Sequence, residues 1–158
     1  MQDIGDRYPN GEVEKDIIEA FAKARGITFP PAYIELISKH DGFYPEIGCF
    51  DFIDTNGELN ISNVEFGGYM HTPHIEGMQF PKGDDDYEGK LVGFGSTPGG
   101  DFICFDYRFP WANDEPKIVL VLHDDFYDYG INENKRRILY LADNFEHFID
   151  SLHEYIEY

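Results

Sequence analysis

The chain has 158 residues, and a hydrophobic content of 42% suits one domain with a packed core and excludes global disorder. Its 12 Lys and Arg residues against 31 Asp and Glu residues give a formal net charge of −19, which would repel nucleic acids and anionic membranes but suits a basic protein partner. No apolar run approaches the roughly 20 residues that span a bilayer. No signal peptide is visible, and two cysteines are too few for a disulfide scaffold, so we expect a cytoplasmic protein.

The first part of the chain predicts two helices. Residues 1–11 are polar and turn-rich, and we expect them to form a flexible lead-in. Apolar residues then recur at helical spacing from Glu12 to a stop at Gly26. This stripe consists of Val13, Ile17, Ile18, Phe21 and Ala24. Pro30 and Pro31 can open a second helix, which we expect to end at Asp41 and Gly42.

The remaining sequence predicts strands and one closing helix. Strands are expected over residues 47–53, 59–64, 91–94, 102–107, 117–123 and 136–142, and irregular loops over residues 65–89 and 124–133. Asp143 or Asn144 can cap a last helix. Its apolar stripe is Phe145, Phe148, Ile149, Leu152 and Ile156. We therefore expect one α+β domain over residues 12–158: an N-terminal helical pair, a mainly antiparallel sheet of five or six strands, and a C-terminal helix packed on the sheet.

A glycine-rich segment, Gly93 to Gly100, joins two of these strands. A Walker-type phosphate loop needs a Lys that meets the phosphates, but no Lys or Arg lies between Val92 and Tyr107. A dinucleotide fingerprint needs a third glycine and a following helix, and both are lacking here. The segment instead predicts a hairpin turn in which Gly99 or Gly100 takes a positive φ.

No motif in the sequence predicts a catalytic residue, a metal site or a cofactor. His71 and His74 form the best metal-binding pair, but zinc needs further ligands that converge in space. A metal-dependent hydrolase that uses His71, His74 and His123 is kept as a minor hypothesis. Cys49 and Cys104 lie in apolar strand patterns, where a thiol usually packs in the core.

Several motifs, taken in order, resemble the SUKH superfamily. The run "IIEAFAKARGITFPPAYIELISKHDGFYPE" at residues 17–46 resembles the family's opening, with Pro30, Tyr33, Asp41 and Gly42 at the matching places. The segment "VGFGSTPGGDFICFDYR" resembles its strand, glycine turn and strand, with Gly99, Gly100 and Asp101 in the turn. "IVLVLHDD" resembles the strand that follows. One departure is that the only Trp is Trp111, whereas the family often has a Trp soon after the second helix.

This resemblance implies a fold and a kind of function. It implies a non-catalytic α+β domain in which the matching residues are structural. Many bacterial members resemble immunity proteins, which bind and neutralise a toxin, whereas fungal relatives act as regulatory scaffolds in cell-wall assembly. An immunity protein is thus the first expectation, and a scaffold or interaction module without a toxin partner is the alternative.

Two acidic segments that contain tyrosines are the predicted partner-binding residues. They are Asp84, Asp85, Asp86 and Tyr87 in one loop, and Asp124, Asp125, Tyr127 and Asp128 in another. Tyr can supply contact area, and Asp can complement a basic partner such as a nuclease toxin. The alternative is that both segments are ordinary solvated loops whose aromatic side chains pack back on the core.

Overall fold

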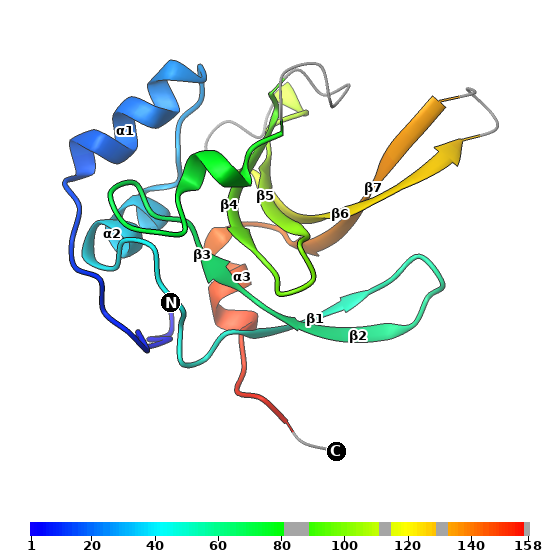
Figure 1. Cartoon of the computed structure of the whole chain (residues 1–158), viewed down its shortest axis with the longest axis horizontal. Helices are drawn as coiled ribbons and strands as arrows, with labels where there is room; N and C mark the ends of the chain where they lie inside the picture. Colours follow the sequence, from blue (N-terminus) through cyan, green and yellow to red (C-terminus); the bar gives the residue numbers. More distant parts are fainter. Residues whose placement is uncertain (81–88, 111–114, 129–132, 157–158) are drawn as a thin grey trace.

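The computed structural model describes residues 1–80, 89–110, 115–128 and 133–156, without the side chains of residues 125–128 and 133–135 (Figure 1). Its helices are α1 (Lys15–Ala24), α2 (Pro31–Lys39), the 3₁₀ helix η1 (Ile75–Met78) and α3 (Phe145–Ser151). Its strands are β1 (Cys49–Ile53), β2 (Leu59–Asn63), β3 (Glu65–Phe66), β4 (Leu91–Ser96), β5 (Phe102–Asp106), β6 (Lys117–Asp128) and β7 (Glu133–Ala142).

The strands form two antiparallel sheets. The main sheet has the order β3-β4-β5-β6-β7, and β1 and β2 form a separate two-stranded hairpin. In Figure 1 this hairpin and the paired ends of β6 and β7 extend to the right, away from α1 and α2 on the left. The α+β class, the N-terminal helical pair and the C-terminal helix on the sheet are confirmed. No helix in the described part of the chain could cross a membrane, given its length and polarity.

The main core is aromatic and centres on Tyr33 of α2, which is fully buried. Its ring packs edge-on against Phe94 of β4, Phe105 of β5 and Phe145 of α3, with ring centroids 5.0–5.8 Å apart. Such contacts favour the positive edge of one ring against the negative face of another. Tyr33 therefore joins α2, α3 and the sheet in one core.

The opposite face of the main sheet is also apolar, as the alternation in residues 102–107 predicts. Leu91, Cys104, Val119 and Val121 form a smaller buried cluster there. Phe80 packs against this cluster. Both faces of the central strands are thus covered, which explains their nearly continuous apolar sequence.

The predicted apolar stripe of helix α1 is confirmed only in part, since Ile18 is buried and Phe21 packs against the core. Ile18 and Ala22 are buried, whereas Ile17 is 38% exposed and Ala24 is exposed. The helix begins only at Lys15, so Val13 is buried from the extended segment before it. Because each helical residue turns by about 100°, a stripe that starts from the non-helical Val13 has the wrong phase.

Helix α3 is shorter than predicted. Asn144 caps it by accepting a hydrogen bond from the backbone N–H of His147 at 2.9 Å, and the helix ends at Ser151. His153 and Cys49 then exchange two backbone hydrogen bonds of 2.9 and 3.0 Å. This pairing holds the chain extended, so Ile156 leaves the predicted stripe and is 49% exposed.

Residues 1–11, expected as a flexible lead-in, contain no helix or strand but pack against the rest of the domain. Ile4 is 2% exposed and belongs to the main core. The side-chain amide of Gln2 donates to the backbone carbonyls of Ile149 and Leu152 at the end of α3. The N-terminal segment therefore contributes to the core and to the capping of α3.

The segment predicted as one irregular loop, residues 65–89, contains β3 and η1. Helix η1 lies against β4, where the backbone carbonyl oxygen of Met78 would be 2.0 Å from a Cβ atom at Gly93. No side chain fits at this position without a backbone shift. The predicted hairpin turn in the glycine-rich segment is confirmed, since the turn between the antiparallel strands β4 and β5 places Gly100 at a φ of +91°.

The Gly93 contact predicts that Gly93→Ala destabilises the domain. We expect a loss of about 3 kcal/mol in the free energy of unfolding, because the Met78 carbonyl must move. Urea unfolding measures this loss. Gly77→Ala is the matched control, because nothing lies within 4 Å of a Cβ atom there. Equal stability of the two variants would contradict the predicted clash.

Candidate functional site

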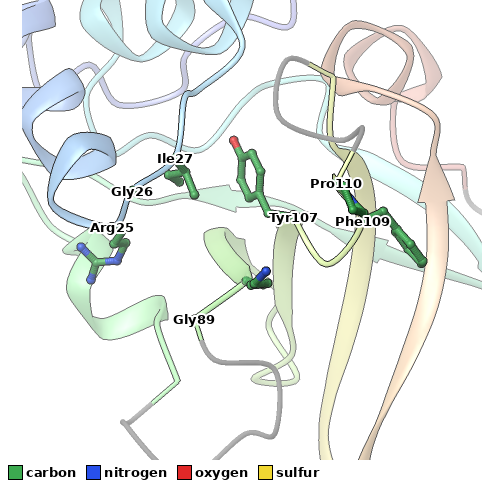
Figure 2. Close-up of a pocket in the computed structure, with 8 residues that line it drawn as sticks. Arg25, Gly26, Ile27, Gly89, Tyr107, Phe109 and Pro110 are labelled. Carbon is green, nitrogen blue, oxygen red and sulfur yellow. The ribbon is translucent and has the colours of Figure 1, made fainter.

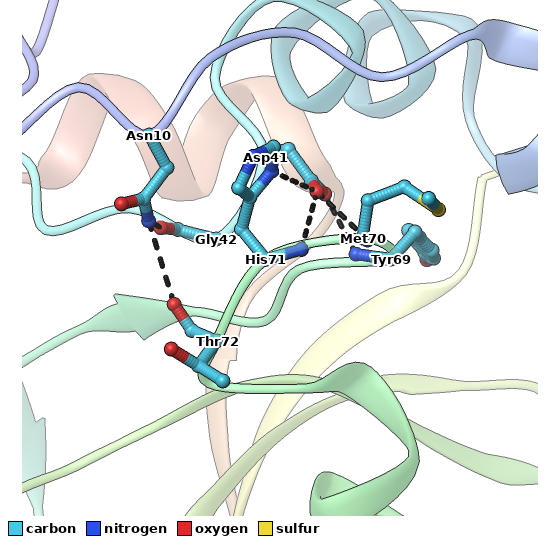
Figure 3. A network of polar contacts seen from close by, with 7 residues as sticks. All are labelled: Asn10, Asp41, Gly42, Tyr69, Met70, His71 and Thr72. Carbon is cyan, nitrogen blue, oxygen red and sulfur yellow. Dashed lines mark hydrogen bonds and ion pairs between the residues drawn. The ribbon is translucent and has the colours of Figure 1, made fainter.

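Asp41, just after α2, is a buried carboxylate that organises the loop after β3 (Figure 3). It accepts hydrogen bonds from the backbone N–H groups of Tyr69, Met70 and His71 at 2.7, 2.8 and 2.9 Å. Nδ1 of His71 lies 2.8 Å from the same carboxylate. These contacts replace the water lost on burial, so Asp41 stabilises the fold.

Gly42 permits the loop to approach the end of α2. Its φ is +58°, and an added Cβ atom would lie 3.0 Å from the carbonyl oxygen of His71. The amide of Asn10 donates to the carbonyl oxygen of Gly42 and, at 3.4 Å, to that of Thr72. Asp41 and Gly42 therefore have a structural role here.

Tyr33 also serves the fold. Its hydroxyl lies 2.8 Å from that of Tyr69, which connects the aromatic core to the Asp41 loop. Burial raises the pKa of Tyr33 well above its ordinary value. Pro30 is buried directly before α2 and Pro31 occupies the first turn. Tyr33 and the two prolines therefore present no reactive group to solvent.

Asp101 ties the turn after β4 to β6. Its carboxylate accepts from the backbone N–H of His123 at 2.9 Å and lies 2.7 Å from Nδ1 of the same ring. Nε2 of His123 lies 2.9 Å from Asp124, whose side chain is 66% exposed. The hydrogen bond to Asp101, with the nearby charge of Asp124, raises the pKa of His123.

The prediction of an irregular loop over residues 124–133 is wrong, because β6 runs to Asp128 and β7 starts at Glu133. Asp125 and Asp128 pair with Arg136 and Glu133, and Tyr127 pairs with Asn134. Three residues of β6 lie opposite one residue of β7 just before this extension. That bulge breaks the apolar alternation, so the sequence pattern ends at His123 although the strand continues. The other predicted group, Asp84, Asp85, Asp86 and Tyr87, lies outside the described residues.

The three histidines of the hydrolase hypothesis have separate roles in the fold. His71 contacts Asp41, His123 contacts Asp101 and Asp124, and the His74 ring accepts a hydrogen bond from the N–H of Glu76 in η1. Among the side chains that the structure describes, no group of three from His, Cys, Asp or Glu could hold a metal ion.

A pocket that no sequence motif predicted lies between the end of α1 and the segment after β5 (Figure 2). Its volume is about 260 Å³, and its lining includes Arg25, Lys90 and Tyr107. Nη2 of Arg25 lies 3.0 Å from Glu76, and its guanidinium stacks 3.7 Å from the Phe21 ring centroid. The Tyr107 hydroxyl donates to the carbonyl of Thr28, and burial raises its pKa. Arg25 and Tyr107 thus already have partners within the protein.

The Asp41 contacts predict that Asp41→Asn destabilises the fold by about 3 kcal/mol. An amide can replace only one carboxylate oxygen as acceptor, so its NH₂ group would face backbone N–H donors. Urea unfolding measures the change. Asp51→Asn is the matched control, because the Asp51 side chain is 49% exposed. Similar losses for both variants would contradict the role of Asp41.

The His123 contacts predict a pH dependence. Because folding raises the pKa of His123 above its ordinary value of 6.5, its stabilising effect is complete below that pH and is lost as the pH rises through the folded pKa. NMR titration of the ring protons measures this pKa. Asp101→Asn is expected to lower it toward 6.5, and an unchanged titration would show that the pairing is absent in solution.

Comparison with family models gives a match to the SMI1 / KNR4 family (SUKH-1) over residues 12–151. Comparisons with curated proteins and with solved structures give no match. The matched range includes both N-terminal helices, both sheets and α3.

Proposed function

The chain belongs to the SMI1 / KNR4 family (SUKH-1), and from this premise we propose that it is a non-enzymatic immunity protein that binds and neutralises a basic toxin domain in the cytoplasm. The observation that carries the proposal is the net charge of −19 on a domain of this family. A field of this sign accelerates encounter with a basic partner and opposes binding to nucleic acid. A nuclease toxin fits best, because nucleases bind phosphates through basic sites.

The proposed binding residues lie in the extension of β6 and in the acidic segment at residues 84–87. Asp124 supplies an exposed carboxylate, and Asp125, Tyr127 and Asp128 follow it on the strand. Asp84, Asp85, Asp86 and Tyr87, which lie outside the described residues, are the proposed contacts of the second segment. Carboxylates that surround Tyr side chains suit a basic protein surface, since the Tyr rings add contact area at low entropic cost.

The absence of an enzymatic role is supported by how the reactive side chains are used. Burial raises the pKa of the Cys49 thiol, which lowers its thiolate fraction and its reactivity as a nucleophile. Tyr33 and Tyr69 have raised pKa values and bond to each other. His71 contacts the buried Asp41. These groups therefore serve the fold.

A regulatory scaffold without a toxin partner is the second candidate, because the same family match includes SMI1 and KNR4 in its description. Gene neighbourhood separates the two functions. A large modular toxin gene beside this one favours immunity, whereas a cell-wall or signalling partner favours a scaffold.

The immunity proposal predicts a stoichiometric basic toxin fragment in a pull-down of the tagged protein from its own organism, read by mass spectrometry at low and high salt. Binding should weaken by about tenfold or more at high salt, because the Debye length shortens. The triple variant Asp124→Lys, Asp125→Lys and Asp128→Lys should lose the partner and fail to protect cells that express the toxin.

The matched control changes the net charge equally on another surface. Glu12→Lys, Asp16→Lys and Glu19→Lys alter exposed side chains in and before α1, and this variant should retain the partner and protect cells. Equal loss in both triple variants would locate the effect in total charge and contradict the proposed face. Capture of a cell-wall enzyme in place of a toxin would move the function to the scaffold.

A further inference from the structure

We propose that the outer edge of β2, with the exposed apolar face of the β1–β2 hairpin, binds an extended basic segment of a partner protein as an added strand. This inference rests on the proposed protein-binding function and names a surface for it separate from the acidic extension of β6. Figure 1 shows the hairpin extending away from α1 and α2, with β2 on its outer side.

The register of the hairpin shows which backbone groups of β2 are open. Asp54 N–H donates to the Glu58 carbonyl and Val64 N–H to the Gly48 carbonyl, so even-numbered residues of the two strands bond to each other. Odd-numbered residues point outward, and Cys49 bonds to His153 in the expected direction. On β2 the outward groups are therefore those of Leu59, Ile61 and Asn63.

Nothing in the described part of the chain pairs with this edge, because the hairpin sheet contains only β1 and β2. Proteins usually protect such an edge with a charged residue, a proline or a covering segment, since it invites another strand. Strand β2 has the sequence LNISN, without a charge or a proline. It offers a row of backbone donors and acceptors for strand addition.

The side chains beside this edge form an apolar face. Leu59 pairs across the hairpin with Ile53, and Ile61 pairs with Asp51. Leu59, Ile53 and Ile61 are 64%, 55% and 39% exposed. Because these pairs are the ones without mutual backbone bonds, their side chains lie close together. An added strand would cover them with its own apolar residues.

The hairpin is held firmly on its other face. Phe50 is buried and packs against Phe148 of α3, with ring centroids 5.8 Å apart. At the turn, Nη1 of Arg137 on β7 donates to Oγ1 of Thr55 at 3.1 Å. Both contacts fix the direction of β2, so a partner strand would meet an edge that is already ordered.

The charge of the hairpin defines the partner's chemistry. Residues 49–63 contain Asp51, Asp54 and Glu58 but no Lys or Arg. Hydrogen bonds from the turn backbone lower the pKa of Asp54, which favours its charged form. A segment that alternates apolar residues with Lys or Arg would place its apolar side chains on Leu59 and Ile61. Its cations would then lie on the opposite face of the strand, on the side of Asp54 and Glu58.

The test is an NMR titration of the ¹⁵N-labelled protein with the capped peptide Lys-Val-Lys-Val-Lys-Val-Lys. We expect amide shift changes centred on residues 59–63. An analogue methylated on every central amide nitrogen keeps the charge and side chains but cannot pair with a strand, and it should bind at least about tenfold more weakly. Shift changes spread over the β6 carboxylates, equal for both peptides, would overturn the inference, as would no binding.

Two variants make the test specific. Ile61→Lys places a cation at the edge and should weaken binding of the peptide by about tenfold or more. Ile156→Lys makes the same change at an exposed residue after α3 and should leave binding unchanged. Amide spectra of both variants check that the hairpin is folded. If Ile61→Lys binds the peptide like the wild type, the edge is wrong, whereas a toxin captured through β6 would still support the immunity function.

Discussion

The buried carboxylate of Asp41 is the constraint on which much of this domain depends. A charge fully removed from water must be matched by donors, and the N–H groups of residues 69–71 supply them. This arrangement fixes the loop after β3 against the end of α2 and brings the Tyr69 hydroxyl to Tyr33. The same loop leads to η1, whose Met78 lies against Gly93 of β4. One ionised side chain thus connects the helical pair, the aromatic core and the main sheet.

The sequence predicted those features that depend on local patterns. The fold class, the capping of α3 at Asn144 and the hairpin turn at Gly100 follow from periodicity and from residues with strong local preferences. The phase of α1 was missed because Val13 lies outside the helix, and the end of α3 because His153 pairs with Cys49. The length of β6 was missed because a bulge interrupts its alternation. The end of α3 was missed because a tertiary contact overrides the local pattern, whereas the other two errors arise from irregular backbone that periodicity does not reveal.

The candidate site was partly accessible from the sequence. Asp41, Gly42 and Asp101 could be singled out by motif, but the bonds described above for them depend on residues 22–32 positions away. The net negative charge of the chain follows from its composition, but the position of Asp124, Asp125 and Asp128 on a strand could not be predicted. The edge of β2, with which no described strand pairs, was not predicted, because the pairing of strands across a sheet leaves no local pattern in the sequence. We therefore propose two kinds of protein-binding surface for the domain, one dominated by carboxylates and one by backbone groups.

The contact between Gln2 and the end of α3 has a consequence for synthesis. Gln2 bonds to Ile149 and Leu152, and Tyr33 packs on Phe145, so these partners of the N-terminal region leave the ribosome after every strand of the main sheet. Until then the emerging helices and strands expose the aromatic surface that α3 covers in the folded domain. The domain therefore completes its core only after α3 has been synthesised, and a chain that ends before α3 becomes a substrate for chaperones and proteases.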